Sequence, residues 1–316
     1  MKIQLVTPAP LGVNNGNRMT ALRWAGILRK LGHQLTIDQV YRGAPCDVMI
    51  ALHARRSFDS IQRFHEQYPQ RPLIVVLTGT DLYRDIHRDR RAQHSLALAT
   101  RLVGLQRMAY KELPRRFHPK TRIIYQSATF SATKPPRPNR LFRVCVIGHL
   151  RKEKDPLRAA MAVRRLPDSS RIQVVHIGRA LNEVYKRRVL AETKHNKRYQ
   201  WLGELNHVKT RRALARSHLL VITSLVEGSA NVLSEALASS VPVIASRISG
   251  LIGTLGEDYP GYFPVGKTEN LRDLLIKAES DARFYRTLQQ RCASLRTLVE
   301  PGRERKAWKN LLQELA

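Results

Sequence analysis

The chain alternates short apolar runs with longer helical stretches, and it does so twice. In the first half, runs such as KIQLVTP, DVMIALH and PLIVVLTG have the length and composition of buried strands. HQLTIDQV, RLVGLQ and RIIYQSA continue the series, and helical patterns at 18–31, 58–67 and 83–100 lie between several of them. Strands that alternate with helices form parallel sheets, so this half is predicted to be a Rossmann-like α/β domain.

A Pro-rich segment without periodicity, SATKPPRPNR at 131–140, ends the first series and reads as a linker. The alternation then restarts with RVCVIGHL, RIQVVHIG, YQWLG, LLVITSL and VPVIAS. We predict an N-terminal Rossmann-like domain at 1–133, a second at 140–300, and an amphipathic C-terminal helix within 301–316 that packs back on the first. Ligands collect at the carboxyl ends of parallel strands, so the two sheets are expected to face each other across a binding cleft.

Composition excludes several classes of protein. The 316 residues are 43% hydrophobic, which suffices for large cores, yet no apolar run approaches the roughly 20 residues that span a bilayer. The start, MKIQLVTPAP, lacks the pattern of a signal peptide. Cys46, Cys145 and Cys292 lie far apart, without metal-ligand spacing, as expected of reduced thiols in a cytoplasmic protein.

The formal net charge of +30 raises the question of an anionic partner. Residues 1–139 carry 23 Lys and Arg against 8 Asp and Glu, and residues 140–316 carry 32 against 17, so each half is +15. The charge is spread, with no basic arm and no recognisable nucleic-acid-binding motif. We therefore expect a solvated, Arg-rich surface and no nucleic-acid partner.

The stretch EGSANVLSEALASSVPVIAS begins at Glu227, just after a predicted strand. Glu227, Gly228 and Ser229 form a turn, and Ser229 is the expected N-cap of the helix that follows. Together with the helix dipole, the amides of Ser229, Ala230 and Asn231 are predicted to form a seat for an anion.

Two glutamates stand eight residues apart in this stretch. Glu227 lies on the strand-end loop, where it can reach a ligand hydroxyl, and Glu235 lies two turns into the helix, where it can bind a deeper group such as a ribose diol. The alternative is a capping carboxylate and a solvated helix residue, which the otherwise apolar helix disfavours.

A second group of candidates follows the strand RVCVIG, in GHLRKEKDP at 148–156. Gly148 permits close backbone approach, and Arg151, Lys152 and Lys154 place three cations on one loop. A diphosphate leaving group needs such neutralisation, because charge builds on its bridging oxygen as the bond breaks. The chain contains no Asp-x-Asp, so we expect no metal and no cofactor. A solvated basic loop is the alternative.

The first domain offers two further polar loops. In TPAPLGVNNGNRMT at 7–20, a turn leads into a helix with a cation on its first turn, and this outlines an anion cradle. Its candidate residues are Gly12, Asn14, Asn15, Gly16, Asn17 and Arg18. The loop lacks the Walker pattern and G-x-G-x-x-G, so ATP and dinucleotides are disfavoured.

The other loop, in LTGTDLYRDIHRD at 77–89, ends a strand at Thr78, Gly79 and Thr80. Aspartates recur every four residues at 81, 85 and 89, interleaved with Arg84 and Arg88. This spacing predicts ion pairs along a helix face, and Thr78, Gly79, Thr80 and Asp81 are the residues expected to reach the cleft. His53, which ends the strand VMIALH, is a further candidate for the cleft, although a lone histidine there is more often structural.

Glu227-x7-Glu235, the following VPVIAS and the G-x-L-x-x-E-K of 148–154 resemble the GT-B retaining glycosyltransferases of the glycogen-synthase-like superfamily. The resemblance implies that Glu227 lies by the donor hexose and that Glu235 binds the nucleotide ribose. It also implies that Lys154 and the residue at position 149 hold the diphosphate. That residue is usually arginine and is His149 here, a departure for which Arg151 is a candidate substitute.

PAPLGVNNGNRMTALRWAGILRKLGH and LTGTDLYRDI are similar to the selenosugar synthases of selenoneine biosynthesis. The resemblance implies that a UDP-sugar, UDP-N-acetylglucosamine above all, reacts with selenophosphate to give a selenosugar, UDP and phosphate. A small trianionic acceptor suits the amides and cations of the 12–18 loop and of Gly79 and Thr80. Because selenophosphate is already ionised, its attack requires no general base.

Two alternatives stay open. One is a GT-B hexosyltransferase for a lipid or cell-envelope acceptor, its basic surface meeting anionic phospholipid. The other is a non-enzymatic nucleotide-sugar sensor or nucleic-acid binder. Glu227 argues against the sensor, because binding UDP alone would not need it. The sequence leaves the oligomeric state and the anomeric outcome open.

Overall fold

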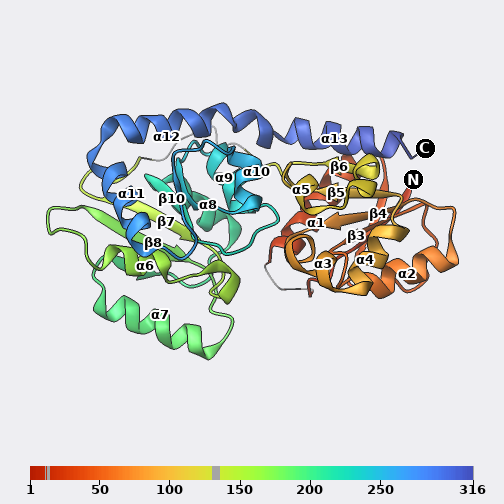
Figure 1. Ribbon diagram of the computed structural model, residues 1–316, viewed down its shortest axis with the longest axis horizontal. Helices are drawn as coiled ribbons and strands as arrows, with labels where there is room; N and C mark the ends of the chain where they lie inside the picture. Colours follow the sequence, from red (N-terminus) through yellow and green to blue (C-terminus); the bar gives the residue numbers. More distant parts are fainter. Residues whose placement is uncertain (11, 13–14, 130–135, 316) are drawn as a thin grey trace. The chain divides into compact units, whose positions relative to one another are not determined.

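The computed structural model describes residues 1–10, 12, 15–129 and 136–315 and separates into two compact units (Figure 1). The first comprises Met1–Ser127, Glu227–Asn231 and Pro301–Ala316, and the second comprises Ala128–Val226 and Val232–Glu300. No helix in the described part of the chain is long and apolar enough to cross a membrane.

The first unit is built on a six-stranded parallel sheet in the order β2-β1-β3-β4-β5-β6. Its strands are β1 (Lys2–Val6), β2 (Gln34–Asp38), β3 (Val48–Leu52), β4 (Leu73–Leu77), β5 (Arg101–Gly104) and β6 (Thr121–Ile123). Its helical segments are α1 (Gly16–Lys30), α2 (Phe58–Gln67), η1 (Asp81–Asp85), α3 (Ile86–Arg88), α4 (Arg90–Leu98), α5 (Ala109–Glu112), η2 (Arg115–Lys120) and α13 (Pro301–Gln313).

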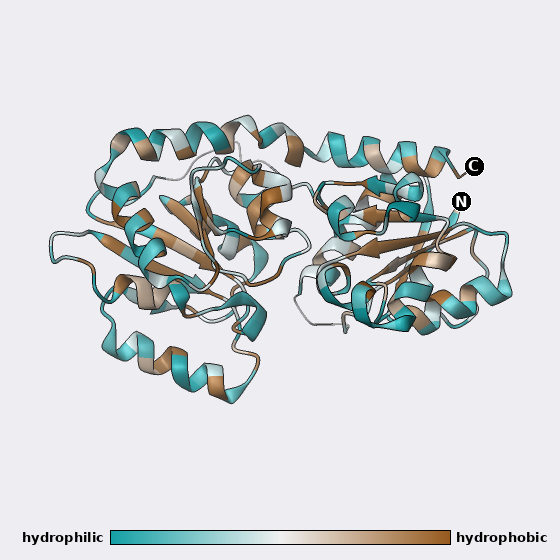
Figure 2. Ribbon diagram, viewed as in Figure 1, coloured by the Kyte–Doolittle hydropathy of each residue, from teal (hydrophilic) through white to brown (hydrophobic). Residues whose placement is uncertain are grey.

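The side-chain alternation of the central strands supplies a core on each face of this sheet. In β3, Met49 and Ala51 join one buried cluster with residues of α2 and α4. Ile50 and Leu52 join the other, which includes α1 and α13. Hydrophobic residues accordingly concentrate in the strands, whereas the outer faces of the helices are mostly hydrophilic (Figure 2).

Helix α13 is attached to α1 through both apolar and polar contacts. The rings of Trp24 and Trp308 meet edge to face with centroids 4.7 Å apart. Beside them the buried carboxylate of Glu304 accepts hydrogen bonds from Trp24 Nε1 at 2.6 Å and from the Ser127 amide at 3.0 Å. Arg23 Nε also pairs with this carboxylate at 3.2 Å, so the buried acid group is both hydrogen-bonded and matched by a cation.

The second unit contains another six-stranded parallel sheet, in the order β12-β11-β10-β7-β8-β9. Its strands are β7 (Phe142–Ile147), β8 (Ile172–Ile177), β9 (Tyr199–Trp201), β10 (Leu219–Ile222), β11 (Val243–Ser246) and β12 (Tyr262–Phe263). Its helical segments are η3 (Lys152–Lys154), α6 (Arg158–Val163), α7 (Glu183–His195), α8 (His207–Ala215), α9 (Asn231–Ala238), α10 (Ser249–Leu255), α11 (Thr268–Ser280), α12 (Ala282–Ser294) and η4 (Arg296–Val299).

The two predicted parallel sheets are confirmed, with two differences in detail. The helix expected over 83–100 is broken into η1, α3 and α4. Strand β12 was not predicted, since its two residues carry no periodic pattern. Residues 131–135 of the predicted linker lie outside the described residues.

Candidate functional site

His53 ends β3 in a backbone conformation that is rare for a residue with a side chain, at φ +74°. The ring is buried, with 2% of the residue exposed. Its Nδ1 accepts a hydrogen bond from the Arg56 amide at 3.3 Å, and its Nε2 lies 3.0 Å from Thr80 Oγ1. Because Nδ1 accepts, the neutral ring carries its hydrogen on Nε2 and donates it to Thr80.

Asp81 organises the end of β4 from inside the protein. Its fully buried carboxylate accepts the amides of Thr78 at 3.0 Å, Gly79 at 2.8 Å and Ala54 at 3.0 Å. The amide of Gly79, predicted to face an anion, therefore donates to Asp81. Thr78 and Thr80 are both partly exposed, so their hydroxyls are the groups of this loop that can reach a ligand.

The predicted ladder of ion pairs along the helix is wrong, because the aspartates bind backbone amides, the adjacent Arg84 and the distant Arg55 instead. Asp85 is buried and pairs with the neighbouring Arg84, Nε to Oδ1, at 2.8 Å. Asp89 caps α4 by accepting the Ala92 amide at 3.1 Å, and it binds Arg55 Nε at 2.7 Å. Tertiary contacts and capping thus take the place of the ion pairs predicted along the helix.

Asn15 caps α1, its side chain accepting the Arg18 amide at 3.0 Å. Gly16, Asn17 and Arg18 form the first turn, with Arg18 partly exposed. Gly12 has φ +89°, as a tight turn requires, while Asn14 lies outside the described residues. No acidic residue stands in this first turn, which leaves the positive end of the helix dipole uncompensated by a local carboxylate.

The segment 227–231 clusters with the first unit. A Cβ on Gly228 would lie 2.2 Å from the Thr78 carbonyl oxygen, so only glycine fits against the end of β4. Asn231 accepts a hydrogen bond from Arg23 at 2.9 Å. Glu227 is buried with 9% exposed. Within the first unit, Gly228, predicted to bind the sugar donor, thus lies against Thr78, predicted to bind the sugar acceptor.

Helix α9 begins at Asn231, so Ser229 lies before the capping position that it was predicted to occupy. No hydrogen bond joins the amides of Ser229, Ala230 and Asn231 to other described residues. Helix termini leave their first amides without intrahelical partners, and those of α9 remain suited to an anion.

Glu235 lies in the second unit, on the second turn of α9. Its side chain is 15% exposed, and its Oε1 lies 2.9 Å from Nε2 of His207 on α8. This contact could not be predicted from sequence patterns, because the two residues stand 28 positions apart.

The loop after β7 is tied closely to the loop after β8. The amides of Gly148 and Leu150 donate to the carbonyls of Ile177 and Arg179 at 2.9 and 2.8 Å. His149 Nδ1 accepts the Arg179 amide at 3.1 Å, so the neutral ring of His149 carries its hydrogen on Nε2.

The cations on this loop differ in their placement. Lys154 lays its side chain along Gly148, where a Cβ would lie 3.6 Å from the Lys154 Cδ. Arg151 is half-exposed and stands 3.9 Å from Glu153 in a weak ion pair. Lys154 is thus the cation that follows the backbone of the loop.

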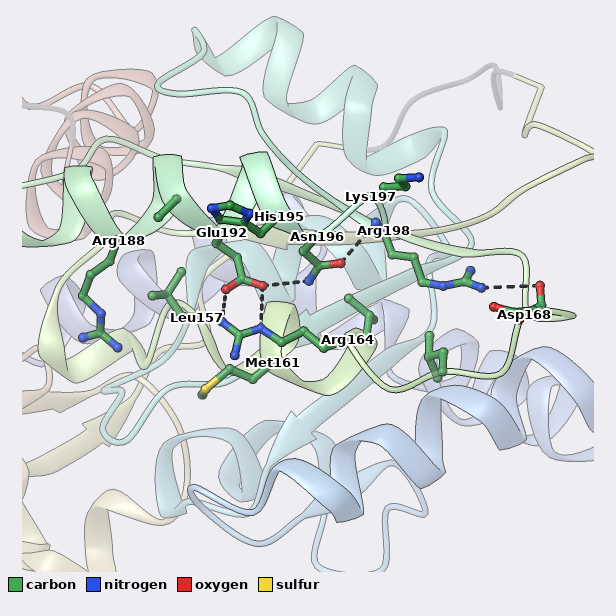
Figure 3. A pocket seen from close by; sticks show the side chains of 13 residues that line it. Leu157, Met161, Arg164, Asp168, Arg188, Glu192, His195, Asn196, Lys197 and Arg198 are labelled. Atoms are coloured by element: carbon green, nitrogen blue, oxygen red, sulfur yellow. Dashed lines mark hydrogen bonds and ion pairs between the residues drawn. The ribbon is translucent and has the colours of Figure 1, made fainter.

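A groove of about 670 Å³ lies elsewhere in the second unit, between α6 and α7 (Figure 3). On one wall Arg164 pairs with the buried Glu192, and on the other Arg198 reaches toward Asp168. Burial acts to raise the pKa of the Glu192 carboxyl, but hydrogen bonds from Arg164 and Asn196 hold that pKa below its ordinary value. None of the residues that line the groove is a predicted site residue, and Arg164 and Glu192 are paired with each other.

Among the described residues, no group of three or more His, Cys, Asp and Glu side chains is placed to hold a metal ion. Metal independence stays a prediction.

Comparison with known proteins extends the picture. The profile of the glycosyl transferases group 1 matches residues 129–294. The sucrose-phosphate synthase of Thermosynechococcus elongatus superposes with a TM-score of 0.81 at 15% identity, over 99% of this chain and 98% of that chain. HepE of Anabaena, solved with UDP and glucose, superposes with a TM-score of 0.79 at 15% identity, over 100% of both chains. A glycosyltransferase of Rickettsia africae reaches 0.75 at 12%, over 99% of this chain and 98% of that chain. At these identities the likeness is one of fold, and the predicted GT-B fold is confirmed.

Proposed function

Since the chain belongs to the glycosyl transferases group 1, we propose that it transfers the sugar of a UDP-sugar to selenophosphate, with UDP-N-acetylglucosamine the first candidate donor. HepE, which shares the fold, was solved in complex with UDP and glucose. The donor half of the proposal rests mainly on the loop 148–154, whose backbone is fixed by hydrogen bonds and carries Lys154 along it.

In this proposal the diphosphate meets Lys154 and the Nε2–H of His149. A neutral imidazole with its hydrogen on Nε2 still donates to a phosphate oxygen, which offers a reason why histidine can replace arginine at this position. Glu235 accepts hydrogen bonds from the ribose diol, and Glu227 from a hydroxyl of the sugar. The amides of 229–231 add donors for an anion.

The acceptor half rests on the direction of one hydrogen bond. His53 donates to Thr80 Oγ1, so the hydroxyl hydrogen of Thr80 is left to be donated onward. Such a group favours a ligand that only accepts hydrogen bonds, as a selenophosphate oxygen does. Arg18 and the first amides of α1 add positive potential from the same unit.

The proposed reaction has two bond-making steps. Selenium attacks the anomeric carbon, the bond from that carbon to the diphosphate oxygen breaks, and UDP leaves with its electron pair. Water then cleaves the selenium–phosphorus bond, which releases phosphate and the selenosugar. Selenophosphate is already ionised, so attack needs no protein base, which is consistent with the engagement of Asp81 by backbone amides.

The test is to incubate the protein with a panel of UDP-sugars, with and without selenophosphate, and to follow UDP and a selenium-containing sugar by chromatography and mass spectrometry. We expect both products to form together and only when both substrates are present. UDP release that requires a lipid or sugar acceptor instead would contradict the acceptor assignment and favour the hexosyltransferase. Tight UDP binding without turnover for any acceptor would favour the sensor.

A further inference from the structure

Two buried polar side chains in the second unit take no part in the proposed chemistry. His176 lies on β8 with 1% of its surface exposed, and Tyr199 opens β9 with 3% exposed. His176 Nδ1 lies 2.7 Å from the Tyr199 hydroxyl oxygen, and His176 Nε2 lies 3.1 Å from the carbonyl oxygen of Gly148. A buried polar pair of this kind costs free energy unless its hydrogen bonds are made.

The direction of both bonds follows from chemistry. A carbonyl oxygen only accepts, so Nε2 carries a hydrogen and donates it to Gly148. Burial lowers the pKa of His176 to about 4, which keeps the ring neutral near pH 7. Nδ1 of the neutral ring must then accept, and the Tyr199 hydroxyl donates to it. The hydroxyl thus selects the tautomer that can bind Gly148.

The bond to Gly148 also orients the residue that follows. A trans peptide places the carbonyl and the next amide hydrogen on opposite sides of one plane. With the Gly148 carbonyl held toward His176, the His149 N–H points the opposite way. This side-chain contact therefore acts together with the backbone bonds of Gly148 and Leu150 to orient the peptide plane that precedes His149.

The neighbouring glycine shows how closely this plane is packed. Gly178 has φ +155°, and a Cβ there would lie 1.9 Å from the Gly148 carbonyl oxygen and 3.0 Å from the His149 nitrogen. Its own carbonyl accepts a hydrogen bond from Trp201 Nε1 at 2.8 Å. His176 of β8 therefore binds the carbonyl of Gly148, and Trp201 of β9 binds that of Gly178, where the two glycines are in contact.

We propose that His176, with its tautomer selected by Tyr199, is a positioning residue that sets the peptide plane of Gly148 and His149 for the donor diphosphate. This rests on the proposed function, which places the diphosphate at the loop 148–154. A loop fixed before the ligand arrives does not have to be ordered on binding, and that saves entropy.

The test compares two single-atom deletions, Tyr199→Phe and Tyr285→Phe. Tyr285 is a matched control, since its partly buried hydroxyl donates to the His218 carbonyl at 2.8 Å in the same unit but away from the loop. Tyr199→Phe loses the hydrogen bond to His176. Tyr285→Phe loses the bond to the His218 carbonyl and also the one that its hydroxyl accepts from Arg137 Nη1 at 3.2 Å, so Tm should fall at least as far in the control. We expect Tyr199→Phe alone to weaken UDP binding or to lower kcat, by roughly five- to tenfold.

Variants of His176 add a rescue measurement. His176→Gln keeps a donor that can reach the carbonyl, and it should retain more UDP affinity and kcat than His176→Leu. If His176→Leu fails to fold, the tyrosine pair still decides. Equal kinetics and UDP affinity for Tyr199→Phe and Tyr285→Phe would overturn the inference.

Lys154→Ala separates that failure from a failure of the proposed function. If Lys154→Ala loses UDP affinity while Tyr199→Phe does not, the diphosphate site stands and the positioning role is wrong. If neither wild type nor Lys154→Ala responds to UDP, the proposed donor site itself is wrong, and the inference falls with it.

Discussion

His207 Nε2 meets Glu235 Oε1 at 2.9 Å, and this contact joins α8 to α9 in the second unit. The imidazole is about half exposed, whereas the carboxylate is mostly covered. The contact restrains one carboxylate oxygen and leaves the other lone pairs for a ligand, which is the arrangement that a ribose diol requires.

Glu235→Ala is therefore expected to weaken UDP binding by about ten- to hundredfold, because a charge-assisted hydrogen bond is worth roughly 1.5–3 kcal/mol. Calorimetry with UDP measures this directly. Glu183→Ala, which removes an exposed glutamate from α7, is the control and should bind as wild type. Wild-type affinity in Glu235→Ala would remove the ribose role from this residue.

The main elements could be predicted because their patterns are local. The residues of a run such as LIVVL are enough to predict a strand without any knowledge of the rest of the chain. Gly148 and Gly228 follow such runs and could be found in the same way. The role of Asp81 could not be predicted, because one of its amide donors is Ala54, 27 residues earlier in the chain. His176 likewise reads as an ordinary strand residue until Tyr199 and Gly148 are brought to it by the sheet.

Gly228→Ala is expected to abolish most transferase activity, since a methyl group there would overlap the Thr78 carbonyl oxygen. The backbone at Glu227 would have to move, and with it the carboxylate proposed to face the sugar. Gly302→Ala is the matched control, because a Cβ at Gly302 meets nothing within 4 Å and alanine suits a helix. Steady-state rates and Tm of both variants decide, and full activity in Gly228→Ala would count against the role of this segment.

Turnover is expected to survive chelation, because the proposed diphosphate site uses protein donors. Lys154→Ala should in contrast slow the reaction by about hundredfold or more, the usual cost of losing a group that stabilises transition-state charge. The measurement is UDP release with EDTA, with and without added magnesium. A rate that collapses in EDTA and returns with magnesium would show that a metal shares this task.

The free energy of unfolding should fall as the pH drops from about 6.5 toward 4. Burial lowers the pKa of His176 from 6.5 to about 4, so the unfolded state binds more protons in this window. The stabilisation is fully present above pH 6.5 and is lost as the pH falls through 4. One such histidine contributes on the order of 3 kcal/mol, from 1.36 kcal/mol per pKa unit.

Urea unfolding at several pH values measures this slope, and His176→Gln should flatten it. His218, whose pKa burial and then neighbouring arginines also lower to about 4, should leave a residual slope in that variant. An unchanged slope in His176→Gln would mean that other groups dominate the acid response.

Arg18→Ala tests the proposed acceptor site in the first unit. If Arg18 meets the charge of selenophosphate, its loss should raise the acceptor KM or lower kcat/KM by more than about tenfold, as expected for a charge-assisted contact. UDP affinity should hardly change, because the residues proposed for the ribose and the diphosphate lie in the second unit. Arg305→Ala removes an exposed arginine from α13 and serves as the control for the loss of one positive charge.

In a purely structural role Arg18 is slightly unfavourable at this end of a helix, since the dipole repels a cation there, and its removal would leave the kinetics unchanged. Kinetics identical to those of Arg305→Ala would therefore remove Arg18 from the acceptor site and weaken the case for selenophosphate relative to an uncharged acceptor.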